Sequence, residues 1–276
     1  MARWQKALLA AAAAGVTASA AEALGLRRRV RNLPVAGLPR ELEGLTILHV
    51  SDVHAGFGPG LALLRRSAEW GRELEPDLVA VTGDLVARRR AAPGFAAAAA
   101  ELVATARHGA YAVLGNHDLA HGRDPFAQGF AGDDLGGLEL LDGAAAELTL
   151  SSRRISLAGA SARRFFRERA YDPASHLDRT ADLRILLCHF PDALPRLAPG
   201  AAQLVLAGHL HGGQLCMPWP GGRIGLAHPR SGPIAAVQAC DGTVMHVSPG
   251  IGTTFVPLRF LARPEATLLR LSAQAR

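Results

Sequence analysis

Short apolar runs alternate with polar, glycine-rich turns from residue 45 onward. Each run is leucine-rich or β-branched and is bounded by turn residues, a pattern that predicts buried strands. Helix-like stretches follow the first two runs, at residues 60–75 and 95–107, and the alanine tract in the second suits a helix packed closely on a sheet. This alternation predicts an α/β fold. The predicted strands are residues 45–50, 77–82, 110–114, 154–160, 183–188 and 202–208.

The C-terminal part of the chain has a different pattern. Residues 234–248 and 265–272 predict antiparallel strands, and Asp241-Gly242 supplies a turn within the first of these segments.

The N-terminus carries an uncharged, alanine-rich run at residues 7–21, followed by Glu22 and a basic block. As a helix this run spans about 22 Å at 1.5 Å per residue, less than the roughly 30 Å of a bilayer core. It fits a cleaved signal peptide, a membrane anchor that needs residues 22–26 to help it span, or a soluble helix. We therefore expect a signal or membrane-anchor segment with its basic block at 1–31, a Pro/Gly linker at 32–44, and one folded domain at 45–276.

The positive charge is concentrated at the same end. The chain has a net charge of +6, of which residues 1–31 carry +5. This distribution predicts contact with an anionic membrane surface and argues against a nucleic-acid-binding body. Basic residues flank the apolar run on both sides, and the block that follows it favours a cytoplasmic domain. The chain's three cysteines form neither a disulfide framework nor a CxxC motif.

Residues able to bind a metal follow five of the predicted strands. Loops at the carboxyl ends of strands carry the chemistry of open α/β sheets, so we expect these side chains to meet. Carboxylate, imidazole and amide ligands suit borderline divalent metals. They are too many for one tetrahedral ion, but two ions sharing a carboxylate would use them all and would activate a hydroxide against a phosphate. The residues are Asp52, His54, Asp84, Asn116, His117, Asp118, His189, His209 and His211.

In this order, "DVH … GD … GNHD … H … GHLH" resembles the calcineurin-like metallophosphoesterase superfamily over residues 45 to about 260. The resemblance implies a four-layer α/β/β/α sandwich of two mixed sheets. It also implies a bend in "GHLH", permitted by the flanking glycines, so that the two histidines reach different ions. His117 resembles the family's transition-state histidine, with Asp118 orienting it where many relatives have Glu. The implied ligands are Asp52, His54 and His211 for one ion, Asn116, His189 and His209 for the other, and Asp84 as the bridge.

The basic N-terminal segment, "GHLHGGQLCMPW" and the tail "SPGIGTTFVPLRFLARPEATLLRL" resemble a membrane-associated bacterial branch of this superfamily. Members of that branch include Mn- or Zn-dependent phosphodiesterases, and some cleave the pyrophosphate of a UDP-linked diacylglucosamine in lipid A biosynthesis. The resemblance implies two divalent ions (Mn, Zn or Fe), association with the bacterial inner membrane, and hydrolysis of a phosphodiester or pyrophosphate by metal-activated hydroxide. The substrate would be a phosphorylated small molecule or a lipid-linked one.

Two other functions compete with this interpretation. A phosphoprotein or phosphomonoester phosphatase predicts more arginines at the site and no membrane segment. A non-catalytic scaffold of the same fold has no reason to retain Asn116, His117 and both histidines of "GHLH" together.

Several other residues have both a functional and a structural interpretation. His121 and Arg123 are candidates for substrate binding, because they follow the "GNHD" loop and arginine pairs with phosphate. Residues 162–173 are either a basic, apolar flap for an anionic lipid headgroup or the edge of an amphipathic helix. Arg259 falls near the site in the tail, as does Arg263. His49 lies inside an apolar strand, which favours a hydrogen-bonded core histidine.

Overall fold

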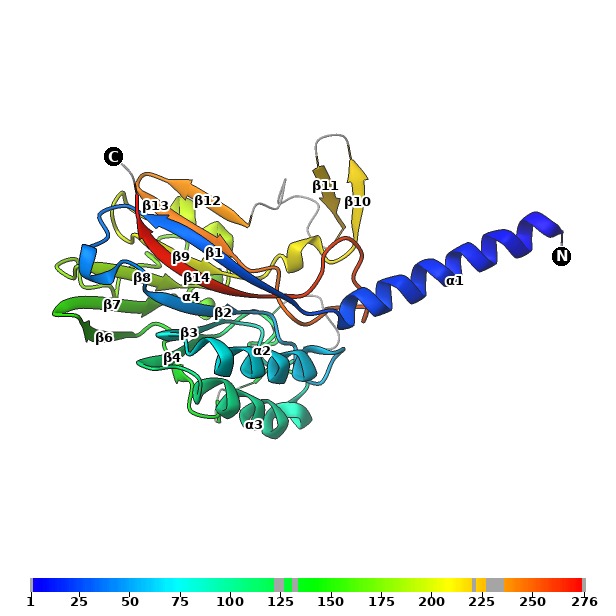
Figure 1. The fold of residues 1–276 in the computed structure, drawn as a ribbon, viewed down its shortest axis with the longest axis horizontal. Coiled ribbons are helices and arrows are strands. Elements are labelled where there is room, and N and C mark those ends of the chain that lie inside the picture. The colour runs from blue at the N-terminus through cyan, green and yellow to red at the C-terminus, as the bar shows by residue number, and fades with distance from the viewer. Residues whose placement is uncertain (1, 122–126, 131–133, 220–221, 227–235, 275–276) are drawn as a thin grey trace.

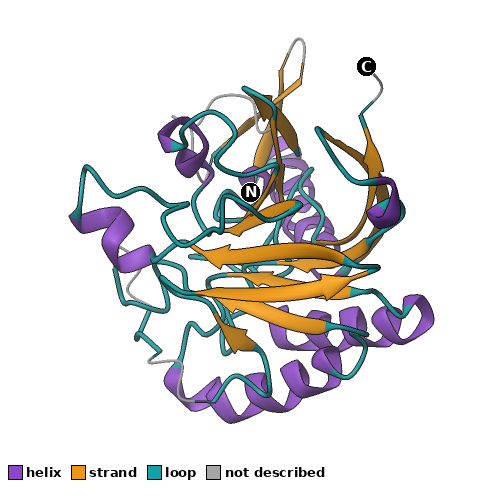
Figure 2. Ribbon diagram, turned by 90° about the vertical axis from the view of Figure 1, so that its left-hand side faces the viewer, coloured by secondary structure: helices purple, strands orange, loops and turns teal. Residues whose placement is uncertain are grey.

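The computed structural model describes residues 2–121, 127–130, 134–219, 222–226 and 236–274. Within them, two six-stranded mixed sheets stack on each other (Figures 1 and 2). The first has the order β1 (Arg27–Val35), β14 (Glu265–Ala273), β2 (Thr46–Val50), β3 (Leu78–Thr82), β4 (Gly109–Val113) and β5 (Glu139–Leu140). The second has the order β12 (Val237–Cys240), β13 (Thr243–Val247), β9 (Leu204–Ala207), β8 (Leu183–Leu187), β7 (Arg153–Gly159) and β6 (Ala145–Leu150).

Helices complete the layers and confirm the predicted four-layer architecture. Helices α2 (Gly60–Leu74) and α3 (Ala92–Val103) cover the outer face of the first sheet. The outer face of the second sheet packs against the short helix α4 (Ala162–Arg167) and the 3₁₀ helix η3 (Pro191–Arg196). Loops supply much of this second cover. The remaining described elements are helix α1 (Arg3–Leu24), the 3₁₀ helices η1 (Arg40–Leu42), η2 (Arg89–Ala91) and η4 (His211–Gly213), and the hairpin β10 (Cys216–Trp219)–β11 (Gly222–Gly225).

Apolar clusters hold these layers together. The cluster between the sheets contains Ile47 and Leu78 from the first sheet and Ile185 from the second, all buried. On the outer face of the first sheet, Phe95 and Leu102 of α3 are fully buried. The consecutive alanines of α3 add little bulk, so this helix packs closely, as its alanine tract predicts.

The predicted strands and helices of the folded domain are confirmed, with shifts of a few residues at their ends. The predicted turn between β12 and β13 is also present. Asp241 and Gly242 have φ of 48° and 80°, the positive values that a two-residue hairpin turn of type I′ requires. Strand β14 pairs antiparallel with β2 but parallel with β1 on its other side, so the expected antiparallel arrangement holds for one of its two neighbours.

The basic block and the predicted linker differ from expectation, because residues 27–35 form strand β1 at the edge of the first sheet. Leu33 and Val35 are buried on this strand, so the segment has its own apolar face. Pro34, Gly37 and Pro39 made residues 32–44 resemble a linker. An edge strand tolerates proline, since the side facing away from the sheet needs no N–H donor.

Helix α1 extends away from the sandwich (Figure 1). It is the one helix in the described chain that is long and apolar enough to cross a membrane. Its 22 residues span roughly 33 Å, more than the shorter run read from the sequence. At its C-terminal end, the Glu22 carboxylate accepts hydrogen bonds from the backbone N–H groups of Leu261 and Ala262, and Ser19 and Ala23 are buried.

Strand pairing fixes which end of the first sheet faces α1. Strand β1 starts three residues after α1 ends and runs parallel to β14. Strand β2 is antiparallel to β14, and β3 and β4 are parallel to β2. The carboxyl ends of β2, β3 and β4 therefore lie at the same end of the sheet as the base of α1 (Figure 1).

Candidate metal centre

The first group of candidate ligands lies where β2, β3 and β9 end. Asp52, His54, Asp84 and His211 are buried and each offers an atom within 4.8 Å of the others. His54 Nε2 is 3.0 Å from His211 Nε2 and 3.5 Å from Asp84 Oδ2. His211 Nε2 is 3.4 Å from Asp52 Oδ1. These four side chains thus surround one small volume with imidazole nitrogens and carboxylate oxygens.

The second group shares Asp84 with the first. Asp84, His189 and His209 also have ligand atoms within 4.8 Å of one another. His189 Nε2 lies 3.3 Å from Asp84 Oδ2 and 3.2 Å from His209 Nδ1. The two histidines of "GHLH" therefore join different groups, and Asp84 is the one carboxylate that belongs to both.

Asn116 lies beside these groups and has an unused acceptor. The backbone N–H of the next residue, His117, donates to Asp84 Oδ1 at 2.8 Å. Among the described residues, the buried Asn116 Oδ1 has no hydrogen-bond partner. A buried amide oxygen without a donor is costly in a folded protein, but it is a suitable ligand for a cation. This unpartnered oxygen is consistent with the ligand role expected for Asn116.

The backbone is strained at the candidate ligands. Positive φ is uncommon for residues with a Cβ and costs of order 1–3 kcal/mol each. The expected bend in "GHLH" is present, but the histidines themselves carry it along with Gly212 and Gly213, rather than the flanking glycines alone. The ligand φ values are 53° for Asp52, 48° for His54, 51° for Asp84, 72° for His209 and 50° for His211.

Glycines let the metal loops approach one another. A Cβ on Gly115 would lie 2.1 Å from Asp84 Oδ1, and one on Gly208 would lie 1.9 Å from Ser51 Oγ. Both distances are far inside van der Waals contact. The glycines of the "GN" and "GHLH" sequences are thus required for close packing around the acidic ligands.

The carboxylates and imidazoles of the two groups shift one another's pKa values. Burial opposes ionisation of Asp84, but the imidazoles of His189, His117 and His54 outweigh it and hold the Asp84 pKa well below its usual range. Burial likewise opposes a charge on His189, yet Asp84 and Asp52 raise the pKa of His189 to about 9. The carboxylates therefore attract positive charge into a space removed from water. A divalent cation bound by both carboxylates and imidazoles would supply that positive charge.

His117 and Asp118 occupy the loop after β4. The His117 ring is buried and meets the His54 ring edge-on, with centroids 4.5 Å apart. Its Nε2 lies 3.9 Å from Asp84 Oδ2. The Asp118 carboxylate accepts backbone N–H groups from Leu85, Val86 and Gly115 at 2.8–3.1 Å. Asp118 thereby ties the loop after β3 to the loop after β4, a positioning role that its sequence context did not reveal.

Helix α4 forms a wall beside the second group. Phe165 is buried and stacks on Phe190, with ring centroids 4.9 Å apart, and Phe190 meets the His189 ring edge-on at 4.8 Å. Phe166 is 41% exposed and its ring centroid is 4.2 Å from that of His121. The helix is therefore amphipathic, and His121 lies with Phe166 at a small surface pocket. The other substrate-binding candidate, Arg123, lies outside the described residues.

Arg259 is a structural residue behind the first group. Its guanidinium is fully buried and its Nη1 donates to the carbonyl of His211 at 3.1 Å. It also donates to the carbonyl oxygens of Pro249, Gly250, Gly252 and Ala262. Arg259 thus fixes the backbone of a candidate ligand from behind. Arg263 is exposed and lines a different pocket.

His49 is a core residue, as predicted. Its two ring nitrogens lie 2.8 Å from His246 Nδ1 and 2.9 Å from Thr82 Oγ1, and burial lowers its pKa to about 3.

Residues 45–213 match the family model for calcineurin-like phosphoesterases, the span that supplies both groups of ligands. The chain belongs to this family. It is 29% identical over 242 residues to an uncharacterized metallophosphoesterase, YkuE of Bacillus subtilis, covering 86% of this chain and 82% of that protein. It is 28% identical to the phosphodiesterase YaeI of Escherichia coli, covering 82% and 81% of the two chains. It is 24% identical to the UDP-2,3-diacylglucosamine pyrophosphatase LpxG of Chlamydia trachomatis, covering 83% and 84%.

Membership of the family gives this metallophosphoesterase its reaction class. YaeI and LpxG, the two relatives above with a named activity, both hydrolyse bonds to phosphate. The chain is accordingly a phosphoric ester hydrolase. Its clustered Asp and His residues have the composition of a dinuclear divalent metal site.

Proposed function

We propose that this metallophosphoesterase hydrolyses a phosphodiester or pyrophosphate bond in a substrate related to membrane lipids. The observation that carries the proposal is the pair of ligand groups joined at Asp84. A shared carboxylate is what two adjacent divalent ions require. A protein that only scaffolds others has no use for two strained, buried ligand groups of this kind.

We assign the residues to two ions by the groups that they form. Asp84 is the bridge, Asp52, His54 and His211 hold one ion, and His189, His209 and Asn116 hold the other. Imidazole with carboxylate ligands suits Mn, Zn or Fe. When bound, the ions supply Lewis-acid activation of water and of the phosphoryl oxygens.

His117 is positioned to act on the substrate. Its backbone N–H is fixed on Asp84 and its ring lies at the edge of the first ligand group. From there the imidazole would donate a hydrogen bond to a phosphoryl oxygen or a proton to the leaving oxygen. The Asp118 carboxylate holds the loop that carries His117 by accepting backbone N–H groups of both metal loops, and we propose that it orients His117 through that loop.

The position of α1 supports a membrane-related substrate. The carboxyl ends of β2, β3 and β4 face the base of α1, and Glu22 in its last turn binds the loop at Leu261 and Ala262. Arg259 connects this same loop to His211. If α1 lies in a membrane, the metal centre is close to its surface. LpxG, one of the relatives, is named for a lipid-linked pyrophosphate, so we place that bond class first and a general phosphodiester second.

We also propose that the folded domain faces the cytoplasm from the bacterial inner membrane. The arginines of β1 directly follow α1, and positive residues next to a membrane helix favour the cytoplasmic side.

Turnover of three substrates tests the proposed bond class. The Mn-loaded enzyme is assayed with a phosphate bis-ester, the matching monoester and UDP-2,3-diacylglucosamine. We expect kcat/KM to be at least tenfold higher for the bis-ester or the pyrophosphate than for the monoester. A preference for the monoester would contradict the proposal and favour a phosphomonoester phosphatase.

The variant His117→Ala serves as the control that turnover belongs to this site. It should bind metal normally and lose two to three orders of magnitude in kcat, because one transition-state contact is worth about 3–4 kcal/mol. Undiminished turnover in His117→Ala would remove this residue from the mechanism.

A further inference from the structure

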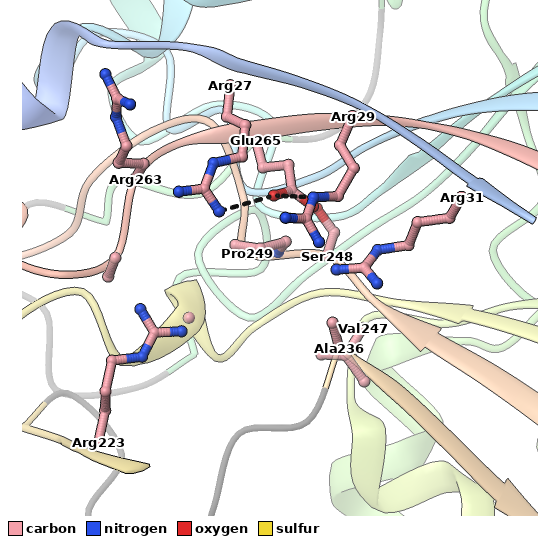
Figure 3. Close-up of a pocket in the computed structure, with 12 residues that line it drawn as sticks. Arg27, Arg29, Arg31, Arg223, Ala236, Val247, Ser248, Pro249, Arg263 and Glu265 are labelled. Carbon is pink, nitrogen blue, oxygen red and sulfur yellow. Dashed lines mark ion pairs between the residues drawn. The ribbon is translucent and has the colours of Figure 1, made fainter. Parts of the chain in front are cut away.

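A second polar pocket lies at the base of α1, apart from the ligand groups (Figure 3). Its volume is about 210 Å³. Arg27, Arg29 and Arg31 extend into it from β1, and Arg223 extends from the hairpin on the opposite side. Arg263 completes the set, which we call the arginine pocket. Alternate residues of a strand share a face, so the sequence "RRRVR" places three arginines together.

The positive charge in the arginine pocket is poorly balanced. Glu265 is the one acidic side chain among the described residues that line it. Its carboxylate lies 3.7 Å from Arg27 Nη1 and 3.5 Å from Arg29 Nε. In the described part of the chain, Arg31 and Arg263 form no ion pair, and the buried Arg31 Nε has no hydrogen-bond partner. Burial, with repulsion from Arg29 and Arg27, lowers the Arg31 pKa.

The pocket opens toward the end of α1. A neighbouring cavity of about 450 Å³ shares Arg27, Arg223 and Arg263 with it and is lined on its other side by Ala21 and Glu22 of α1. Arg263 also packs next to Gly25, where a Cβ would lie 3.2 Å from Arg263 Nη2. The unbalanced arginines are therefore located where a membrane-spanning α1 would leave the bilayer.

Exposed apolar side chains surround this end of the molecule. Outside α1, large exposed hydrophobic residues concentrate in and just after the β10–β11 hairpin and in the loop before β14. A backbone hydrogen bond from Cys216 to Phe260 joins the hairpin to that loop. Such a surface is unfavourable in water but suits the interface of a bilayer. The residues of this apolar rim are Met217, Ile224, Leu226, Phe255, Val256, Phe260 and Leu261.

We propose that the arginine pocket binds the phosphate of an anionic phospholipid headgroup and seats the folded domain on the membrane. Guanidinium groups bind phosphate through paired, charge-assisted hydrogen bonds. The apolar rim and α1 favour a lipid over a soluble anion, because they would lie among acyl chains while the arginines face the headgroups. The proposal does not depend on the hydrolytic reaction, since no ligand of the metal centre lines the pocket.

Lipid binding by the full-length chain in detergent tests the proposal. Short-chain phosphatidylglycerol, phosphatidylcholine and inorganic phosphate are titrated into wild type, Arg223→Gln/Arg263→Gln and Arg31→Gln. These variants leave both partners of Glu265 in place. The control, Arg40→Gln/Arg179→Gln, removes two exposed positive charges elsewhere on the surface. Phosphate groups can also bind at the metal centre. Binding at the arginine pocket is therefore measured by the difference in ligand affinity between each variant and the control.

We expect phosphatidylglycerol to bind wild type and control at least tenfold more tightly than phosphatidylcholine. The double variant should lose at least tenfold in phosphatidylglycerol affinity at an unchanged melting temperature, and Arg31→Gln should lose several-fold. Equal affinity of the variants and the control would overturn the proposal, as would equal binding of the two lipids. A further contrary outcome is that the variants lose as much affinity for inorganic phosphate, relative to the control, as they lose for phosphatidylglycerol. In that case the pocket binds a soluble anion and the lipid assignment is wrong.

Discussion

At the scale of single residues, the candidate ligands combine a strained backbone with buried, ionisable side chains. Asp52, Asp84 and His211 each hold a positive φ, at 53°, 51° and 50°. They are also buried, and their ligand atoms lie within 4.8 Å of one another. Backbone strain of this kind persists only where surrounding contacts impose it. Ions bound between the ligands would provide such contacts, so we expect the loops to be more stable when metal is present.

The glycines of the metal loops give a sharp prediction at this scale. In Gly115→Ala, the new Cβ would lie 2.1 Å from Asp84 Oδ1 and 2.5 Å from the Asp84 backbone nitrogen. Asp84 must shift, and both ligand groups lose their common member. We expect metal affinity, measured by calorimetric titration, to fall at least tenfold.

Gly94→Ala in α3 is the matched control for this substitution. Its Cβ would meet only the end of the flexible Leu61 side chain, at 3.2 Å, and alanine favours a helix. Metal affinity should therefore be unchanged in Gly94→Ala. Normal metal binding by Gly115→Ala would show that the loops are not packed as described.

The sequence predicted the identity of the candidate ligands but not the conformation that brings them together. Strand ends and residue types are readable, so Asp52, Asp84 and His211 could be placed at one edge of a sheet. The positive φ of these residues was not readable, because intrinsic preferences favour negative φ for aspartate and histidine alike. Tertiary contacts at the site override that preference, and they are visible only in the fold.

At the scale of secondary-structure elements, the loop between β13 and β14 links α1 to the metal centre. Arg259 is the connecting residue. It is buried by long-range contacts, and its carbonyl partners span residues 211–262. No local pattern could separate this structural arginine from a phosphate-binding one. The same limit applies to β1, whose edge position in the sheet explains why Pro34 does not interrupt it.

Replacing Arg259 by methionine should destabilise this connection strongly. Methionine fills much of the same volume but leaves the buried carbonyl oxygens of His211, Gly250 and Gly252 without their donor. Each buried group left unsatisfied costs about 1–3 kcal/mol. We expect Arg259→Met to lower the free energy of unfolding by at least about 3 kcal/mol, measured by urea denaturation.

Arg179→Met provides the comparison, because Arg179 is exposed. A surface substitution of this type changes stability by no more than about 0.5 kcal/mol. If Arg259→Met were as stable as Arg179→Met, the guanidinium would not be the support that its hydrogen bonds indicate.

At the scale of the whole molecule, α1, the apolar rim and the arginine pocket lie at one end of the sandwich, and the metal centre faces that end. The sequence predicted a basic N-terminus near a membrane. It did not predict that the basic residues form a strand of the first sheet, because β1 pairs with β14, more than 200 residues later in the chain. Helix α1 and the folded domain are therefore joined through a strand of the sheet that carries the metal loops.

Deleting residues 2–18 tests this arrangement. The deletion removes most of α1 but keeps the buried Ser19 and the Glu22 contacts with Leu261 and Ala262. We expect the shortened protein to hydrolyse a soluble phosphate bis-ester within about twofold of the full-length rate. It should lose most of its activity on a substrate embedded in vesicles. Equal activity of both proteins on the substrate in vesicles would show that α1 is not needed for hydrolysis of a membrane-embedded substrate.

The central claim is that two metal ions share Asp84, and the electron paramagnetic resonance spectrum of the Mn-loaded protein tests it most directly. Wild type should show the spectrum of an exchange-coupled Mn(II) pair, because ions bridged by one carboxylate lie only about 3.5–4 Å apart. In Asp84→Asn the coupling should disappear together with most of the bound metal. Wild-type protein that, at saturation, shows only isolated Mn(II) ions would contradict the account.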